Sequence, residues 1–413
     1  MPTSRSAPVL RYVTEEQGQD YLSALIRVFH GDYKADHWDL DRRIFEWDRC
    51  FGFTVDDRWV ATTGAFTKTM TVPGGTVPVA AVTVVTVSPA YRRRGLLRQM
   101  MTHQLGDVHR RREPVAALWA SEAPIYGRFG YGSAIPRLHL RGSTKGTDFL
   151  PQVDLGDGWV EEPTREEYAA TVPGVHARLL PDRPGGLDRN ESWWERRLLD
   201  DPDRRSGASG LRYALHRSAG GEVDGYAMYR VKEDWTPEGG TGEVRVTELD
   251  AATGPARTAL WRYVLDLDLI TDVTAHDIPI DEPLRYQLLD PRALRVQVAD
   301  SIYIRVVDVK AALAARRYAA DLDLVVGLRD QMLAHNDGAF RIEAGAEGAR
   351  VTRSRRRPDL VMDIRELGAG YLGGISFQQL HTAGLLTEQT PGAVAAMTLA
   401  FDWFRKPFCN DDF

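Results

Sequence analysis

The chain has 413 residues, of which 43% are hydrophobic and 27% are charged. These values are typical of globular proteins, and the length suggests about three domains. The formal net charge of −6 does not support nucleic-acid binding. The two cysteines, Cys50 and Cys409, indicate no disulfide framework, and no apolar run reaches the ~18 residues of a membrane span. Because no signal peptide is recognisable either, we expect a cytoplasmic protein that binds neither nucleic acid nor a membrane.

The first third of the chain reads as an α/β domain that begins with a meander of strands. Apolar and β-branched runs alternate with turn residues, and two stretches have helical spacing. The expected strands cover 9–13, 51–55, 59–63, 65–72, 76–87 and 115–120, and the expected helices cover 15–29 and a segment from 96 onward.

A strand, a basic turn and a helix follow one another between Val82 and Val108. Ser88-Pro89 ends the buried strand, since proline cannot donate to a sheet ladder. Arg92, Arg93 and Arg94 precede Gly95, which opens an amphipathic helix. A helix N-terminus offers N–H groups and a partial positive charge, so this turn is suited to hold a polyphosphate. Its residues match neither a Walker A loop nor a dinucleotide fingerprint.

The segment after the strand at 115–120 carries two candidate proton donors. Its sequence is S-E-A-P-I-Y-G-R-F-G-Y-G, with Tyr126 and Tyr131 five residues apart. A phenol has a pKa of about 10, close to that of a thiol leaving group, so either tyrosine is a suitable acid. Each is equally compatible with a packed core position, and the pattern alone does not choose between them.

Two further domains are expected, with boundaries near residues 145 and 298. In the second, the strand at 242–249, the helix at 256–267 and the strand at 270–275 repeat the β-helix-β order, but their turn has one arginine instead of three. The third has strands at 302–307, 341–343, 349–353 and 360–364 and a short helix at 309–318. A G-x-G-x-x-G match at 368–373 lacks room for a doubly wound sheet and is expected to be coincidental.

The chain ends in an aromatic and acidic segment. Its last thirteen residues contain five large aromatic side chains and end in Asp411, Asp412 and Phe413. Such a tail is expected to be buried, although packing within its own domain alone is an equally good interpretation. Burial would bring the terminal carboxylate and two aspartates together as an anionic pocket that attracts amines.

The motif R-R-R-G-L-L resembles the acyl-CoA-binding motif of the GNAT superfamily of N-acetyltransferases, with Leu97 replacing the usual small residue. Together with S-E-x-x-I-Y-x-R-F-G-Y-G and the phenylalanine at the C-terminus, it resembles the enhanced intracellular survival (Eis) family over the whole chain. The resemblance implies an α/β (α+β) protein. A catalytic GNAT domain (1–145) and a degenerate GNAT-like domain (146–298) would precede a sterol-carrier-protein-like domain (299–413).

The resemblance also assigns roles to residues of this chain. It implies that Tyr126 is the general acid, in preference to Tyr131, and that the C-terminal carboxylate of Phe413 is the general base. Asp411 and Asp412 are expected to bind the substrate. The expected acetyl-CoA contacts are Val85, Thr86, Val87, Arg92, Arg93, Arg94, Gly95, Leu96, Leu97, Arg98, Ser121 and Glu122.

The expected activity is direct acetyl transfer from acetyl-CoA to primary amines of a cationic substrate through a tetrahedral intermediate, without a metal. The family resemblance favours aminoglycosides, acetylated at several positions, and a homohexamer. Lysine side chains or polyamines are alternative substrates. A protein that carries an apolar ligand in its C-terminal domain is the alternative of another class, although three adjacent arginines favour a retained anion site.

Overall fold

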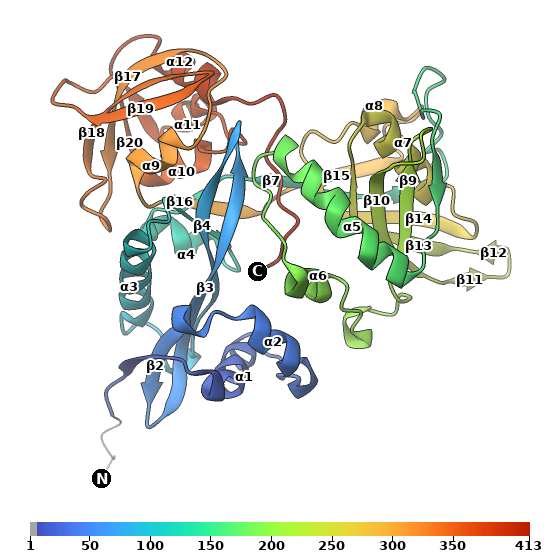
Figure 1. Cartoon of the computed structure of the whole chain (residues 1–413), viewed down its shortest axis with the longest axis horizontal. Coiled ribbons are helices and arrows are strands. Elements are labelled where there is room, and N and C mark those ends of the chain that lie inside the picture. Colours follow the sequence, from blue (N-terminus) through green and yellow to red (C-terminus); the bar gives the residue numbers. More distant parts are fainter. Residues whose placement is uncertain (1–5) are drawn as a thin grey trace. The chain divides into compact units, whose positions relative to one another are not determined.

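The computed structural model describes residues 6–413. The chain divides into two compact units. The first comprises the described residues up to Ile135, Ser301–Phe404 and Asp411–Phe413, and the second comprises Pro136–Asp300 and Arg405–Asn410. Figure 1 labels most of their helices and strands. Among the residues described, no helix combines the length and apolarity needed to cross a membrane.

A seven-stranded sheet in the first unit has the order β1-β2-β3-β4-β5-β16-β6. Only the β4–β5 pair is parallel, and the other neighbours are antiparallel. The strands are β1 (Val9–Tyr12), β2 (Phe51–Val55), β3 (Arg58–Val72), β4 (Gly75–Val87), β5 (Val115–Trp119), β16 (Ile302–Val306) and β6 (Gly132–Ser133). The accompanying helices are α1 (Gly18–Val28), α2 (Trp38–Ile44), α3 (Leu96–Arg110) and α4 (Ala123–Tyr126).

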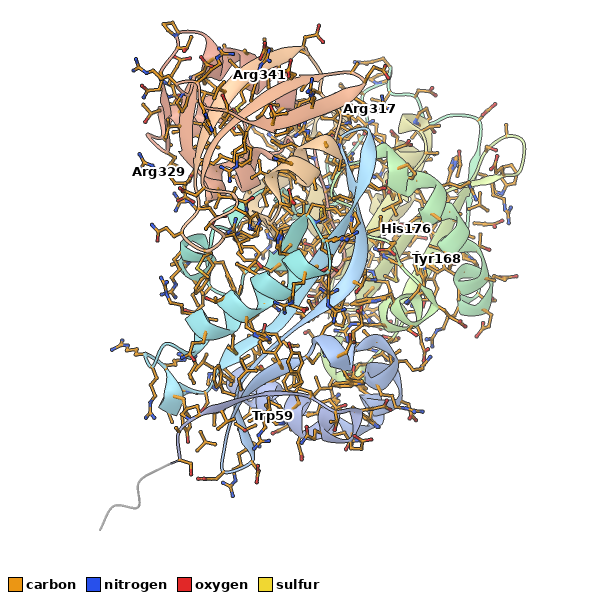
Figure 2. All side chains as sticks on the ribbon, turned by 60° about the vertical axis from the view of Figure 1, so that its left-hand side comes forward. Trp59, Tyr168, His176, Arg317, Arg329 and Arg341 are labelled. Atoms are coloured by element: carbon orange, nitrogen blue, oxygen red, sulfur yellow. The ribbon has the colours of Figure 1, made fainter. Side chains whose placement is uncertain are left out.

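Strands β3 and β4 form a long hairpin. The two strands expected at 59–63 and 65–72 are one strand, because a register shift at Thr62–Gly64 bends β3 without ending it. Gly74 turns the chain with a φ of +68°, a value that a side chain would strain. Tyr21 of α1 packs edge-on against Trp59 of β3, with 5.2 Å between the ring centroids; Trp59 is labelled in Figure 2.

Strand β16 occupies an unexpected position. The sequence suggests that residues from 299 onward begin the third domain. The structure pairs Ile302 with Trp119 and Val306 with Val115, so β16 lies between β5 and β6 of the first sheet. A segment more than 180 residues after β5 in sequence therefore completes the sheet that carries the basic turn.

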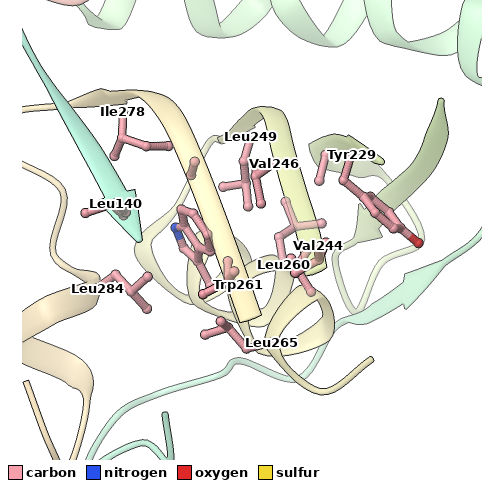
Figure 3. Close-up of a cluster of buried hydrophobic side chains, with 14 of the residues drawn as sticks. Leu140, Tyr229, Val244, Val246, Leu249, Leu260, Trp261, Leu265, Ile278 and Leu284 are labelled. Atoms are coloured by element: carbon pink, nitrogen blue, oxygen red, sulfur yellow. The ribbon is translucent and has the colours of Figure 1, made fainter. Parts of the chain in front are cut away.

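The second unit repeats the β-helix-β order. Parallel strands β13 and β14 are joined by α7, as expected. Trp261 of α7 lies at the centre of the core shown in Figure 3, packed with Leu140, Ile278 and Leu284. The sheet has the order β15-β7-β14-β13-β10-β9-β8, beside a small β11–β12 hairpin. The elements are β7 (Pro136–Ser143), β8 (Trp159–Glu161), α5 (Arg165–Leu179), α6 (Glu191–Arg197), β9 (Arg212–Arg217), β10 (Val223–Lys232), β11 (Trp235–Thr236), β12 (Gly239–Gly240), β13 (Gly242–Ala251), α7 (Gly254–Leu265), β14 (Ile270–Pro279), α8 (Leu284–Gln287) and β15 (Leu294–Asp300).

A five-stranded sheet with the order β19-β18-β17-β20-β21 completes the first unit. Its central strand, β17, was not expected from the sequence. Asp323 of β17 pairs at 2.7 Å with Arg341 of β18, which is labelled in Figure 2. The elements are α9 (Val309–Ala314), β17 (Leu322–Arg329), β18 (Gly338–Gly345), β19 (Gly348–Arg353), β20 (Leu360–Asp363), α10 (Ile364–Gly370), α11 (Phe377–Thr382), β21 (Leu386–Glu388) and α12 (Ala393–Phe401).

Two of the three glycines of the G-x-G-x-x-G match, Gly368 and Gly370, serve close packing at the end of α10. A Cβ atom on Gly368 would lie 2.4 Å from the backbone oxygen of Ile304, and one on Gly370 would lie 2.4 Å from the ring of Phe377. These contacts explain both glycines without a phosphate ligand. The two seven-stranded sheets, the five-stranded sheet and their helices together confirm the predicted α/β fold class.

Candidate active site

Strands β4 and β5 part in the middle of the first sheet. They pair only through Val79–Ala81 and Val115–Ala117, so the two parallel strands splay apart beyond these residues. Beyond this point Val84 has a φ of +50°, and its carbonyl accepts a 2.7 Å hydrogen bond from the Thr62 hydroxyl. The left-handed conformation of Val84 redirects the end of β4. The backbone of β4 beyond Ala81 has no parallel neighbour.

The segment from Val85 to Val87 lies beyond this parting. Val85 and Val87 are half-buried, while Thr86 is buried and its hydroxyl lies 2.6 Å from that of Thr62. Because Thr62 holds Val84 and Thr86 together, the strand end is positioned before any ligand binds. The edge of this segment that faces away from β3 has no strand neighbour, so its backbone is suited to pair with an extended amide-containing ligand.

The basic turn leads from β4 into the N-terminus of α3. Arg93 and Gly95 have φ values of +61° and +78°, so the chain turns twice through the left-handed region. Gly95 is the N-cap residue and provides no side-chain hydrogen bond to the helix. The first N–H groups of this 15-residue helix therefore remain available to an anion.

The arginines of the turn are solvent-exposed and keep their charge unneutralised. Arg92 donates to the Val87 carbonyl at 3.4 Å, and Arg94 donates to the Ala90 carbonyl at 3.2 Å. Within residues 6–413, Arg92, Arg93, Arg94 and Arg98 form no ion pair. A cluster of like charges beside a positive helix end favours a bound polyanion.

Two expected contact residues have apolar roles. Leu96 is buried, and Leu97 is half-buried against the cores on both sides of it. Their side chains anchor the first turn of α3 in the domain. Only their backbone N–H groups are placed to serve a ligand.

Tyr126 ends α4 and is buried, with 4% of its surface exposed. Burial raises the pKa of its phenol to about 12, opposed by a hydrogen bond with Ser121 and reinforced by Glu122. Ser121 and Glu122 themselves are exposed and precede the helix. At neutral pH Tyr126 therefore carries its proton, as an acid must before it donates.

Tyr131 is buried completely, and its ring lies edge-on to that of Tyr126 with 6.1 Å between centroids. Its hydroxyl makes no hydrogen bond to any described residue. The two candidate acids are therefore neighbours with different surroundings. Ser121 and Glu122 act on the pKa of Tyr126, whereas the Tyr131 hydroxyl is buried without a polar partner among the described residues.

The end of the chain returns to the first unit. The indole Nε1 of Trp119, the last residue of β5, donates a 2.7 Å hydrogen bond to the Asp411 carbonyl. Asp411 and Phe413 are half-buried, and Asp412 is exposed. Trp119 was not identified from the sequence, because an indole N–H at a strand end does not specify its partner.

The expected burial of the aromatic tail holds only in part. Phe401 is buried and Phe408 is half-buried, but Phe404 is 81% exposed. Within the second unit, the N–H of Phe408 donates to the Pro184 carbonyl at 2.8 Å, and Arg183 donates to the Lys406 carbonyl at 2.7 Å. Hydrogen bonds to main-chain carbonyls therefore contribute to fixing the tail alongside aromatic packing.

The corresponding turn of the second unit is chemically different. Its arginine, Arg257, is buried and pairs with Glu282 and Asp250, with 2.9 Å between Nε and the Glu282 carboxylate. The neighbouring carboxylates neutralise this guanidinium from within the unit. The turn therefore lacks the positive charge that a pyrophosphate site requires.

Comparisons with known proteins agree with this arrangement. Models described as "Acetyltransferase (GNAT) domain" match residues 9–134 and 185–306, and a "Sterol carrier protein domain" matches 309–410. The chain is 39% identical to an uncharacterized N-acetyltransferase of Streptomyces coelicolor, covering 95% of this chain and 96% of the relative. It is 35% identical to N-acetyltransferase Eis of Mycobacterium tuberculosis over 80% of each chain. The crystal structure of Eis1 from Mycobacterium abscessus superposes with a TM-score of 0.85 at 31% identity, covering 98% of this chain and all of the other.

The protein is thus an N-acetyltransferase with two GNAT domains and a sterol-carrier-like domain. Enzymes of the GNAT superfamily use acetyl-CoA as the acetyl donor. Within that superfamily, the chain belongs to the Eis family of N-acetyltransferases.

Proposed function

We propose that this chain transfers the acetyl group of acetyl-CoA to primary amines of a cationic substrate of the aminoglycoside type, at more than one position. The observation that carries this proposal is the hydrogen bond from Trp119 to Asp411. It holds the chain end beside the strand that leads, seven residues later, to Tyr126. The carboxylates of Asp411, Asp412 and the C-terminus attract ammonium groups.

The first unit supplies groups that fit acetyl-CoA. The unneutralised arginines and the uncapped start of α3 suit its pyrophosphate. The backbone beyond the parting of β4 and β5 suits the amides of its pantetheine arm. We assign this binding to Val85, Thr86, Val87, Arg92 through Arg98, Ser121 and Glu122.

The chemical step needs one proton acceptor and one proton donor. Acetyl-CoA supplies an activated acetyl thioester when bound. The C-terminal carboxylate of Phe413, directly or through a water, takes a proton from the substrate ammonium. The amine nitrogen then bonds to the acetyl carbon to give a tetrahedral intermediate. As this intermediate collapses, the carbon–sulfur bond breaks and the Tyr126 hydroxyl donates its proton to the leaving sulfur. The second proton that the nitrogen loses on becoming an amide returns through water to the Tyr126 phenolate.

Release of free thiol from acetyl-CoA tests this function. The full chain is assayed with an aminoglycoside, a polyamine and a lysine-containing peptide at matched concentrations. We expect the highest kcat/KM with the aminoglycoside and more than one acetyl group per molecule by mass spectrometry. Preference for the polyamine or the peptide would replace the aminoglycoside as the substrate class, and no thiol release with any amine would contradict the transferase function.

The family resemblance further leads us to propose a homohexamer. Light scattering coupled to size-exclusion chromatography would give about six chain masses of 46.2 kDa each. A monomeric mass would contradict the assembly without affecting the proposed chemistry.

A further inference from the structure

Thr62 of β3 is not among the expected site residues, yet its hydroxyl bonds to β4 where the two parallel strands have parted. Thr62 is 1% exposed, and its Oγ1 donates to the Val84 carbonyl at 2.7 Å. Because a threonine hydroxyl carries a single hydrogen, the 2.6 Å contact between the Thr62 and Thr86 hydroxyls is donated by Thr86. A chain of hydrogen bonds therefore runs from Thr86 through Thr62 to the Val84 carbonyl.

Val84 belongs to a β-bulge in β4. Where β3 has one residue, Thr63, the opposite strand has two, Val84 and Val85. Val84 has a φ of +50°, a left-handed conformation that glycine normally takes in a bulge. A β-branched residue is strained in this conformation and persists there only where its surroundings hold it.

Two features of β3 hold Val84 in the left-handed conformation. Gly64 leaves room for its side chain, since a Cβ atom on Gly64 would lie 3.2 Å from Val84 Cγ2. Thr62 supplies a donor to a carbonyl that the bulge has taken out of the regular ladder of backbone hydrogen bonds. Without the Thr62 hydroxyl, the strain of Val84 would remain while its carbonyl lost this bond, so the balance would shift away from the bulge.

We propose that Thr62 is a positioning residue for the acetyl donor. By holding Val84 in the left-handed conformation, its hydroxyl directs the free edge of Val85–Val87 toward the pantetheine arm of acetyl-CoA. Thr62 acts through Val84 and not by contact with the donor. The inference rests on the proposed binding of acetyl-CoA to Val85–Val87 and names a residue on which that binding depends.

Isothermal titration calorimetry of the full chain tests this role with two ligands. CoA contains the pantetheine arm, whereas 3′-phospho-ADP keeps the phosphates of CoA and lacks the arm. Thr62→Val keeps the shape of the side chain and removes its donor. We expect this variant to weaken CoA binding about 10-fold, as the loss of one buried hydrogen bond allows, and to leave the Kd of 3′-phospho-ADP within about two-fold of wild type.

The adjacent threonine provides a matched control. Thr63 is buried, and its hydroxyl makes no hydrogen bond to any residue that the structure describes. Thr63→Val should therefore leave both Kd values unchanged and maintain or raise Tm. Thr62→Ser retains the hydroxyl and should restore CoA binding to within about three-fold of wild type. Unchanged CoA binding in Thr62→Val, or equal weakening of both ligands, would overturn the role of Thr62.

A double variant tests whether Thr62 acts through Val84. Glycine takes the left-handed conformation without strain, so the bulge in Val84→Gly needs less support. In this background, Thr62→Val should raise the Kd of CoA by about two-fold or less, and a loss of about 10-fold in both backgrounds would overturn the route through Val84. A wild-type chain that does not bind CoA would contradict the proposed function itself, whereas wild-type CoA binding that Thr62→Val leaves unchanged would overturn this inference alone.

Discussion

Trp119 and Asp411 are 292 residues apart in sequence, yet the indole Nε1 of the former donates to the carbonyl of the latter at 2.7 Å. The bond fixes the last residues of the chain at the end of β5. Trp119 stands directly before the segment that contains Ser121 and Tyr126, so the tail and the proposed acid share one strand as their support.

Loss of this bond should loosen the chain end. Trp119→Phe retains an aromatic ring but removes the donor, and we expect kcat to fall about 10-fold with little change in KM for acetyl-CoA. Steady-state kinetics of thiol release measure both constants. Trp235→Phe, at a 63% exposed tryptophan, is the control and should behave as wild type. A kcat equal to wild type in Trp119→Phe would show that the bond has no role in turnover.

The phenol of Tyr126 should be required for turnover and not for binding. We expect Tyr126→Phe to lower kcat by about 100-fold or more, the usual contribution of a general acid, while the Kd for CoA stays the same. Tyr131→Phe is the neighbouring comparison and should retain kcat within a few-fold. If Tyr131→Phe were the inactive variant instead, the acid would have to be reassigned.

The pH dependence of Tyr126 follows from its burial. Since burial raises the pKa of this phenol to about 12, its neutral form persists above the pH at which an exposed tyrosine ionises. Between pH 7 and pH 10, ionisation of Tyr126 should therefore cause no loss of kcat. The difference in tyrosinate absorbance between wild type and Tyr126→Phe measures the pKa directly. A transition near pH 10 in that difference would contradict the buried environment.

The arginines of the basic turn should bind acetyl-CoA through their positive charge. Arg93→Ala is expected to raise KM for acetyl-CoA about 10-fold and to weaken its dependence on salt, because one charge-assisted contact is lost. Arg110→Ala is a control at the other end of α3, where an exposed arginine already pairs with Asp107 at 3.2 Å. KM values that respond equally to both variants would indicate a general effect of net charge.

Local patterns in the sequence were sufficient to predict the strand, the basic turn and the helix between Val82 and Val108. Apolar periodicity, the proline that ends the strand and Gly95 all act within a few residues of one another. The same local signals predicted the β13-α7-β14 unit, in which the structure confirms both strands and the helix and shows the strands paired in parallel.

Features that depend on distant partners were not predictable in this way. The run from Ile302 to Val306 shows that a strand exists, but an apolar run does not specify which sheet it joins. For the tail, composition indicated burial, but Phe404 is 81% exposed. The burial of each aromatic ring therefore depends on its own neighbours in the fold. The bond from Trp119 to Asp411 has no sequence signature, since its partner is a backbone carbonyl.

The central claim is that the C-terminal carboxylate of Phe413 accepts the substrate proton. Appending one glycine after Phe413 keeps every side chain and displaces the carboxylate by one residue, about 3.5 Å. Phe404→Ala, at an exposed tail position, is the control for a general disturbance of the tail.

The decisive measurement is kcat of the glycine-extended chain under saturating acetyl-CoA and amine. The account predicts a fall of about 100-fold or more, as for loss of a general base, with an unchanged Kd for CoA and a normal kcat in Phe404→Ala. A glycine-extended chain that turns over within about two-fold of wild type would contradict the assignment, since no base contribution of the usual size would then reside at the chain end.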